Sequence, residues 1–246
     1  MSEQTDFEIS HQVPYYECDA SGHLTIGMLF RLLILVSEEH STAQKVGPDR
    51  VKALGGGWVI IDYDGTINRL PKRGETAVFG TRVAAYNRFF VVRDFWVKDA
   101  AGTVQVKVKG LFAFMNLTSR KIATIPTALS EPFQLPESRR LPKVARPTAQ
   151  AVDDQWQASD YRVRFFDIDL NNHVNNACYF DWLLDPLGSD FLLYHRLVGL
   201  KIKYDHEVRA GATVTSTFRR EGAVTYHQVQ SQDGVAAEAE FTWEEC

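Results

Sequence analysis

An internal repeat limits what this chain can fold into more than any other feature. The segment PYYECDASGHLTIGMLFRLL (14–33) aligns without a gap to RFFDIDLNNHVNNACYFDWL (164–183). Four pairs of identical residues share an offset of 150: Asp19 with Asp169, His23 with His173, Phe30 with Phe180, and Leu33 with Leu183. A repeat that begins in polar sequence and continues into apolar sequence indicates that one structural unit occurs twice.

The sequence after each copy of the repeat also matches in kind. In the first half, an apolar segment over residues 25–46 predicts a buried helix that Gly47-Pro48 ends. In the second half, residues 175–194 predict a helix that Pro186 breaks. Alternating apolar and polar residues, clearest in VQVKVK, then predict four strands per half. Their ranges are 58–68, 77–86, 89–98 and 103–116, then 197–204, 212–219, 224–231 and 235–243.

These patterns predict an α+β fold, the tandem double hotdog, in which each half is a long central helix wrapped by an antiparallel meander. Two such sheets that join edge to edge would hide their exposed edges. Residues 126–147 hold five of the nine prolines, which predicts an extended linker. We expect a first hotdog domain at 1–128, the linker at 129–152 and a second hotdog domain at 153–246.

Composition excludes several classes of function. A net charge of −4 and a pI near 6.0 argue against a nucleic-acid binder. The three cysteines, Cys18, Cys178 and Cys246, form no C-x-x-C pair, so we expect no disulfide framework and a reducing, cytoplasmic setting. The N-terminus MSEQTDFEIS lacks the character of a signal peptide, and the longest apolar stretch (26–36) is too short to span a bilayer.

Several stretches resemble the acyl-acyl-carrier-protein (acyl-ACP) thioesterase family, whose members are double-hotdog hydrolases of plant plastids and some bacteria. DLNNHVNN (169–176) is close to the family's D-x-N-x-H-x-N-N run, and INRLPKRGE (67–75) is similar to its N-R-x-P-x-x-G turn. VRDFWVKDAAG (92–102) and FMNLTSRKIATIP (114–126) resemble its central strands and their exit. The likeness extends from about residue 7 to the C-terminus.

The resemblance implies that the catalytic residues lie in the second half. They are Asp169, Asn171 and His173 of the polar run, with Glu207 of KYDHEVRAG as the fourth, on the first strand after the helix. No cofactor is expected. A metal site is not expected either, because no second histidine stands at ligand spacing from His173.

A cysteine nucleophile is disfavoured. Some family members carry a cysteine directly after the catalytic Glu, but this chain has Val208 there. Cys178 is expected more than a turn inside the second-half helix, and Cys18 belongs to the other half. A Cys–His scheme of the papain type therefore has no suitable thiol.

Thioester hydrolysis needs an activated nucleophile and donors for the charge that develops on the carbonyl oxygen. A helix that begins near Asn175 would offer unpaired N–H groups to that oxygen, so Asn175 and Asn176 are expected to contact substrate. Glu207 is the preferred base for water. Asp169 either orients His173 or attacks the thioester to form a mixed anhydride. The plain alternative is that the Asn residues only cap a helix.

The first half keeps Asp19 and His23 but has Ser21 where the second half has Asn171. We therefore expect it to bind the acyl chain in an apolar channel between its helix and its sheet. Ordinary core packing would give the same sequence pattern. The predicted lining residues are Ile26, Leu29, Phe30, Leu33 and Trp58.

Acyl carrier protein is acidic, so an acidic enzyme needs a local basic face to bind it. The densest basic cluster lies in the linker and consists of Arg139, Arg140, Lys143 and Arg146. Lys72-Arg73 and Arg219-Arg220 are alternatives. Ordinary surface charge is the commoner explanation for any of the three.

The leading prediction is a cytoplasmic bacterial hydrolase that releases free fatty acid from acyl-ACP and so ends fatty acid elongation. The N-terminus lacks the long Ser-rich, basic extension of a plastid precursor. The nearest rival is an acyl-CoA thioesterase on the same fold. A hotdog dehydratase and a non-catalytic acyl-binding module are further alternatives. The expected partners are acyl carrier protein and the fatty acyl substrate, and a homodimer is left open.

Overall fold

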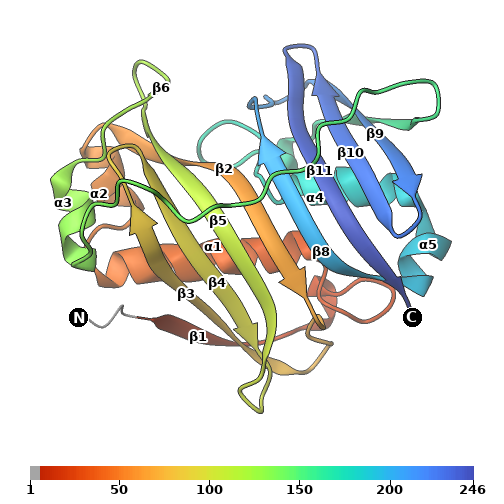
Figure 1. Ribbon diagram of the computed structural model, residues 1–246, viewed down its shortest axis with the longest axis horizontal. Helices are drawn as coiled ribbons and strands as arrows, with labels where there is room; N and C mark the ends of the chain where they lie inside the picture. The colour runs from red at the N-terminus through yellow and green to blue at the C-terminus, as the bar shows by residue number, and fades with distance from the viewer. Residues whose placement is uncertain (1–5) are drawn as a thin grey trace.

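The computed structural model describes residues 6–246 as one large antiparallel sheet with its long helices packed against one face (Figure 1). The strands are β1 (Phe7–Gln12), β2 (Gly56–Ile67), β3 (Thr76–Tyr86), β4 (Phe90–Lys98), β5 (Val104–Asn116), β6 (Lys121–Ile122), β7 (Gln157–Arg162), β8 (His195–Tyr204), β9 (Thr213–Glu221), β10 (Val224–Ser231) and β11 (Gly234–Glu245). The α-helices are α1 (Ile26–Ala43), α2 (Pro48–Ala53), α3 (Thr127–Ser130), α4 (Cys178–Leu184) and α5 (Ser189–Tyr194). Short 3-10 helices are η1 (Tyr15–Glu17), η2 (Glu131–Phe133), η3 (Phe165–Asp167) and η4 (Asp185–Leu187).

The two halves join through β2 and β8, which pair antiparallel from Asp62 opposite Lys203 to Thr66 opposite Gly199. The strand order is β1-β3-β4-β5-β2-β8-β11-β10-β9-β7, with β6 attached to β5. In Figure 1, α1 and α4 both lie behind this sheet. The predicted double hotdog, with its halves joined edge to edge, is confirmed.

The predicted meander is wrong for the first strand after each long helix. Strands β3, β4 and β5 are neighbours in order, but β2 pairs with β5 instead of β3. In the second half β8 likewise pairs with β11. Apolar alternation predicts where strands form but carries no information about their neighbours. This order places β2 and β8 in the middle of the molecule, where the halves meet.

The helices differ from the prediction at their ends. Helix α1 begins at Ile26 because the Thr25 hydroxyl accepts a hydrogen bond from the Met28 N–H at 3.1 Å. Pro48 not only follows α1 but opens α2, at a position where its missing N–H costs nothing. In the second half the predicted break is confirmed, since α4 ends at Leu184 and Pro186 lies in η4.

The repeat extends to the backbone hydrogen bonds. Five of them recur at the same offset. One example is the bond from the Asp19 N–H to the His23 carbonyl (2.9 Å), repeated from Asp169 to His173 (3.0 Å). Another is the bond from the Thr25 N–H to the Glu17 carbonyl (3.0 Å), repeated from Asn175 to Asp167 (2.8 Å). The unpredicted edge strands β1 and β7 also start 150 residues apart, at Phe7 and Gln157. Each structural unit therefore begins with an edge strand, before the segment in which the sequence repeat was recognised.

The segment between η2 and β7 crosses the face of the sheet opposite the helices (Figure 1, green). Its Arg146 guanidinium binds both oxygens of Asp62 on β2, at 3.1 and 3.0 Å, and the Asp62 side chain is only 1% exposed. The Thr148 N–H donates to Glu240 on β11 at 2.8 Å. This strap thus spans the joint between the halves. Within residues 6–246, no helix has both the length and the apolar character needed to cross a membrane.

Candidate active site

The polar run of the second half forms a tight turn. The Asp169 carboxylate accepts a hydrogen bond from the Asn171 N–H at 2.8 Å, and the Asp169 N–H donates to the His173 carbonyl at 3.0 Å. Asn172 has a φ of 63°, a left-handed conformation that asparagine tolerates better than most residues. The turn therefore brings the side chains of Asp169 and His173 to one side, whereas Asn171 is exposed.

The turn is fixed at both ends. Before it, Asp167 accepts hydrogen bonds from the Arg164 backbone N–H and guanidinium. Burial alone would raise the pKa of Asp167, but these hydrogen bonds outweigh it and lower that pKa. After the turn, the Val174 N–H donates to the Val208 carbonyl at 2.8 Å. That bond ties the turn to the loop that carries Glu207.

His173 lies between two carboxylates. Its Nδ1 is 3.9 Å from Asp169 Oδ1, and its Nε2 is 3.8 Å from Glu207 Oε1. Both distances exceed a hydrogen bond, yet sites without substrate often have such open geometry. The Nδ1 atom also lies 3.2 Å from the Val174 carbonyl oxygen. The three side chains are 23–29% exposed, so substrate can reach them.

The prediction that Glu207 lies on the first strand after the helix is wrong. Glu207 lies in the loop that follows β8. The sheet pairing of β8 ends at Tyr204, opposite Ala237. Because the backbone leaves the sheet there, the loop can bend toward the turn and bring Glu207 to His173.

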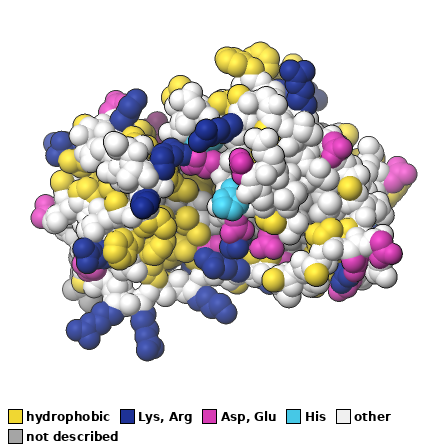
Figure 2. Space-filling view, turned by 90° about the horizontal axis from the view of Figure 1, so that it is seen from above, with side chains coloured by type: hydrophobic (Ala, Val, Ile, Leu, Met, Phe, Trp, Pro, Cys, Tyr) yellow, Lys and Arg dark blue, Asp and Glu magenta, His cyan; other side chains and the backbone are white. Residues whose placement is uncertain are grey.

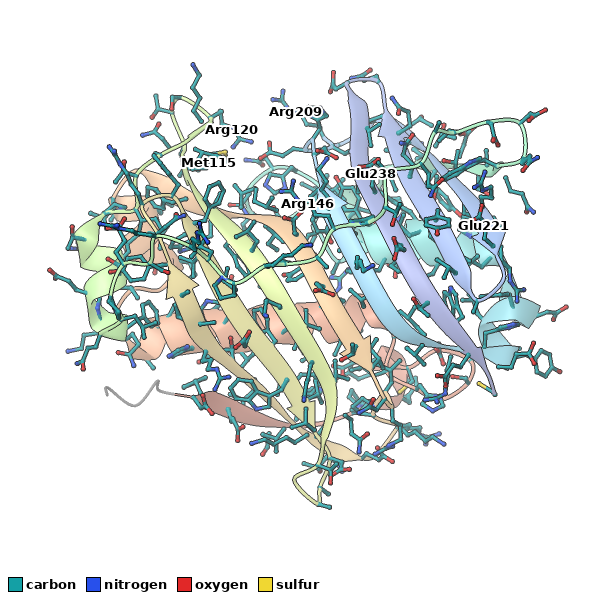
Figure 3. The ribbon with its side chains drawn as sticks, viewed as in Figure 1. Met115, Arg120, Arg146, Arg209, Glu221 and Glu238 are labelled. Atoms are coloured by element: carbon teal, nitrogen blue, oxygen red, sulfur yellow. The ribbon has the colours of Figure 1, made fainter. Side chains whose placement is uncertain are left out.

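Sequence reasoning missed Arg120, whose guanidinium forms an ion pair with Glu207 Oε2. Arg120 belongs to the turn between β5 and β6, so the first half contributes a charge to a site of the second half. Figure 3 labels it at the top of the first half, on the side that faces the second half. The two residues are 87 positions apart, and no periodicity or motif links them in the sequence.

The prediction that a helix beginning near Asn175 presents free N–H groups is wrong, because α4 begins at Cys178. The Asn175 N–H donates to the Asp167 carbonyl at 2.8 Å, and the Asn175 side chain accepts from the Ala177 N–H at 3.0 Å. Such local side-chain bonds compete with helix formation, which explains the later start. A substrate contact of Asn175 stays a prediction, and it would not involve these donors.

Asn176 offers a different donor. Its side-chain Nδ2 is buried, and so is the hydroxyl of Tyr63, beside which the Asn176 side chain lies. The Asn176 carbonyl accepts from the Tyr204 hydroxyl at 3.1 Å. Burial raises the pKa of both tyrosines, so both phenols stay neutral. A buried amide donor beside the polar turn is a candidate group for binding substrate.

Cys178 is the first residue of α4, so its predicted place more than a turn inside the helix is wrong. It is nevertheless unsuited to be a nucleophile. The side chain is buried, and burial raises the pKa of its thiol. Its Sγ contacts the Arg31 guanidinium at 3.4 Å and the Asp167 carbonyl at 3.8 Å.

The turn of the first half that is equivalent to residues 169–173 has no carboxylate in the position of Glu207. There the Ser21 hydroxyl donates to Asp19 at 2.6 Å and lies 2.8 Å from His23 Nδ1. The Leu24 N–H donates to the Pro71 carbonyl, as the Val174 N–H does to Val208. The residue before Pro71 is Leu70, which therefore stands where the second half has Glu207.

The predicted acyl-binding residues fall into two groups. Ile26, Leu29, Phe30 and Leu33 are buried on α1, in one hydrophobic core with residues of the sheet. Trp58 is 36% exposed on β2 and packs edge-on against Phe114. Figure 2 shows hydrophobic side chains gathered on the first-half part of the face seen from above. The exposed large apolar residues at this end of the first half are Trp58, Phe89, Leu117 and Ile122.

The predicted carrier-binding cluster divides as well. Arg139, Arg140 and Lys143 are exposed, whereas Arg146 is bound to the buried Asp62 (Figure 3). A docking role for Arg146 would compete with this contact. The other three remain the predicted docking residues. No group of three His, Cys, Asp or Glu side chains within residues 6–246 is placed to hold a metal ion.

Two family models match almost the whole chain: the acyl-ACP thioesterase N-terminal domain matches residues 4–133, and the C-terminal domain matches residues 150–245. A provisionally assigned oleoyl thioesterase from Lactobacillus plantarum is 35% identical in sequence. Its solved structure has a TM-score of 0.95, and the match covers 99% of this chain and 98% of that one. An acyl-ACP thioesterase from Bacteroides thetaiotaomicron, 20% identical, has the same fold, with a TM-score of 0.85 and coverage of 97% and 98%.

Curated relatives are more distant. A chloroplastic acyl-acyl-carrier-protein hydrolase of Cuphea viscosissima and a chloroplastic palmitoyl-acyl carrier protein thioesterase of Cuphea hookeriana are each 27% identical over 161 residues. The match covers 61% of this chain and spans only 38% of the length of either relative. With both family models matched in their expected order, the chain belongs to the acyl-ACP thioesterase family.

Proposed function

We propose that this chain hydrolyses the thioester of fatty acyl-ACP, releasing free fatty acid and carrier protein. The observation that carries the proposal is the position of His173 between Asp169 and Glu207, in a partly open site. The first half, with Leu70 in place of the acid, has no such arrangement. The two Cuphea relatives are named as a hydrolase and a thioesterase of acyl-ACP, and these names support acyl-ACP as the substrate.

In the proposed reaction Glu207 accepts a proton from water, and the water oxygen attacks the thioester carbonyl carbon. The negative charge that develops on the carbonyl oxygen is met by donors from His173 and the buried Asn176 amide. When the C–S bond breaks, the proton that Glu207 accepted passes to the carrier thiolate, which leaves as the thiol. Asp169 orients the His173 ring, which is the role that its long contact at 3.9 Å fits best.

The acyl chain is proposed to run from this site into the first half, along Leu29, Phe30 and Leu33 of α1. The hydrophobic side chains that gather on the first half in Figure 2 support this direction. Opening such a channel requires the packed core to part, as the buried state of these residues implies. The division into domains at 1–128 and 153–246 is part of the same proposal, with acyl binding in the first and chemistry in the second.

The carrier is proposed to dock on Arg139, Arg140 and Lys143, whose charge complements an acidic protein. An acyl-CoA thioesterase on the same site is the remaining rival, and it differs only in the carrier that it accepts. The cytoplasmic setting and the homodimer also stay predictions. Size-exclusion chromatography with light scattering tests the homodimer.

The deciding experiment is steady-state hydrolysis of matched acyl-ACP and acyl-CoA substrates over several chain lengths. His173→Ala is expected to lower kcat by about 10²–10⁴-fold. His23→Ala is the matched control, because His23 occupies the equivalent turn of the first half and is expected to leave kcat unchanged.

A preference for acyl-CoA would replace the proposed carrier but keep the site. Equal loss in both histidine variants would count against the second half as the seat of catalysis. Absence of turnover by the folded wild-type protein, together with tight retention of fatty acid, would favour the acyl-binding module instead.

A further inference from the structure

We propose that Arg120 is a positioning residue, which reaches from the first half to hold Glu207 in the orientation that hydrolysis needs. The inference rests on the proposed function, since it assigns the supporting contact of the proposed base. It also gives the first half a direct part in the chemistry, separate from acyl binding.

The geometry divides the two oxygens of Glu207 between two partners. Oε2 forms the ion pair with the Arg120 guanidinium, and Oε1 faces His173 Nε2 at 3.8 Å. A carboxylate with one oxygen held in a charge-assisted contact can rotate less about its side-chain bonds. Arg120 thereby presents the second oxygen to the site.

The turn that carries Arg120 is itself held firmly. The Asn116 side chain accepts hydrogen bonds from the Thr118 and Ser119 N–H groups, at 3.0 and 2.8 Å. The Arg120 N–H donates to the Asn116 carbonyl at 2.9 Å, and the Leu117 N–H donates to the Gly55 carbonyl at 3.0 Å. These hydrogen bonds fix the backbone of residues 116–120, from which the Arg120 side chain extends to Glu207. A rigid base is what a positioning contact requires.

The backbone of Arg120 is unfavourable for arginine. Its φ of 55° is in the left-handed region, where glycine or asparagine is the ordinary choice. An arginine at this place is explained by its side chain, because the turn alone would be better served by glycine. Strained conformations of this kind collect at functional sites.

A carrier-docking role for Arg120 is the alternative, since its side chain is 42% exposed. The two roles differ in kinetics. Loss of a docking contact raises KM, whereas loss of a contact that holds the base lowers kcat. The next residue supplies the control, because Lys121 at the start of β6 is exposed and forms no ion pair with Glu207 among the residues that the structure describes.

The test compares Arg120→Met with Lys121→Met in the wild-type chain. Arg120→Met is expected to lower kcat by about 10–100-fold with little change in KM for acyl-ACP, as expected for a misplaced catalytic group. Arg120→Lys is expected to recover part of the loss, and Lys121→Met to keep the wild-type kcat. A raised KM at unchanged kcat, or equal effects at both positions, would overturn the inference.

Two further readouts separate positioning from mere stabilisation. Arg120→Gly relieves the left-handed backbone, so its Tm is expected to match or exceed that of the wild type while kcat falls as in Arg120→Met. A crystal structure of Arg120→Met is expected to show Glu207 turned away from His173. Glu207 still within 4 Å of His173 Nε2 would overturn the inference even without an activity assay, whereas an inactive wild type would count against the proposed function.

Discussion

Phe30 of α1 and Phe180 of α4 stack with their ring centroids 4.2 Å apart and their planes 19° from parallel. They are also equivalent residues of the repeat, 150 positions apart. The two central helices therefore meet through the same side chain of each unit. Both rings are fully buried, so this contact links the cores of the two halves.

Truncation of either ring is expected to destabilise the whole chain. Phe30→Ala and Phe180→Ala should each lower the free energy of unfolding by about 3–5 kcal/mol, through lost burial and the cavity left behind. The double variant should lose less than the sum, because the pair shares a contact worth about 0.5–1.5 kcal/mol. Urea unfolding measures all three. Phe79 is buried on β3 and provides the control. The losses of unfolding free energy in Phe79→Ala and Phe180→Ala should simply add in the double variant.

Isotope labelling can reveal attack by Asp169 on the thioester carbonyl carbon. Asp169 Oδ1 already accepts the Asn171 N–H and lies beside His173, so we expect it to orient rather than attack. In a single turnover in heavy-oxygen water, label should enter the fatty acid and not Asp169. Label in a peptide that contains Asp169, found by mass spectrometry, would instead establish the mixed anhydride.

Arg146 and its neighbours in the strap should respond differently to mutation. Arg146→Met leaves the buried Asp62 carboxylate without its partner and should cost about 1–3 kcal/mol of stability, less than for a fully buried pair because the Arg146 side chain is 53% exposed. Its KM for acyl-ACP should stay near that of the wild type. Thermal unfolding and steady-state kinetics provide the two measurements.

Charge reversal of the exposed cluster tests the docking surface. The triple change Arg139→Glu, Arg140→Glu and Lys143→Glu should raise KM for acyl-ACP several-fold and leave KM for acyl-CoA unchanged. Rising salt should shrink the difference between the variant and the wild type. An unaltered KM for acyl-ACP would move the docking face elsewhere, to Lys72-Arg73 or Arg219-Arg220.

Stability should fall as the pH drops from 6.5 toward 4. Burial lowers the pKa of His40 to about 4 and that of His227 to about 3. Between these values and the ordinary 6.5, the unfolded chain binds protons that the folded chain excludes, so acid favours unfolding. Each histidine should cost about 3 kcal/mol by pH 4. Urea unfolding across this range measures the slope.

His227→Phe should flatten that slope, because it removes one of the two titrating groups. A phenylalanine ring fits this place, since the His227 ring stacks on Phe218 and packs at a tilt against Phe241. His40 remains as the internal reference. Equal slopes in the wild type and in His227→Phe would mean that His227 carries its proton in the folded state.

Much of the fold was readable from the sequence where apolar alternation is strong. Strand β10 begins and ends at the predicted residues 224 and 231, and β4 differs by one residue at its start. The edge strands β1 and β7 were missed because FEISHQ and QASDYR are short and polar, as protected sheet edges often are. Strand order could not be read, since it depends on contacts between distant residues.

The site was readable only where its residues are close in sequence or lie in a recognised motif. Asp169 and His173 belong to one turn, and Glu207 follows from the family motif. The predicted helix start was three residues too early, because the Asn175 side chain accepts a hydrogen bond from the Ala177 N–H. Such a local bond competes with the helical backbone bonds, and the apolar periodicity of the sequence does not reveal it. The contact of Arg120 with Glu207 could not be predicted from the sequence, because the turn that carries Arg120 approaches Glu207 only when the sheets of the two halves pair through β2 and β8.

Leu70 in the place of Glu207 has a consequence for stoichiometry. Two identical single-hotdog subunits would carry two identical sites, and any change in one pocket would appear in the other. Joining the units in one chain removes that constraint, so one copy can lose its acid while the other keeps it. Titration with a tight-binding substrate analogue should accordingly find one site per polypeptide.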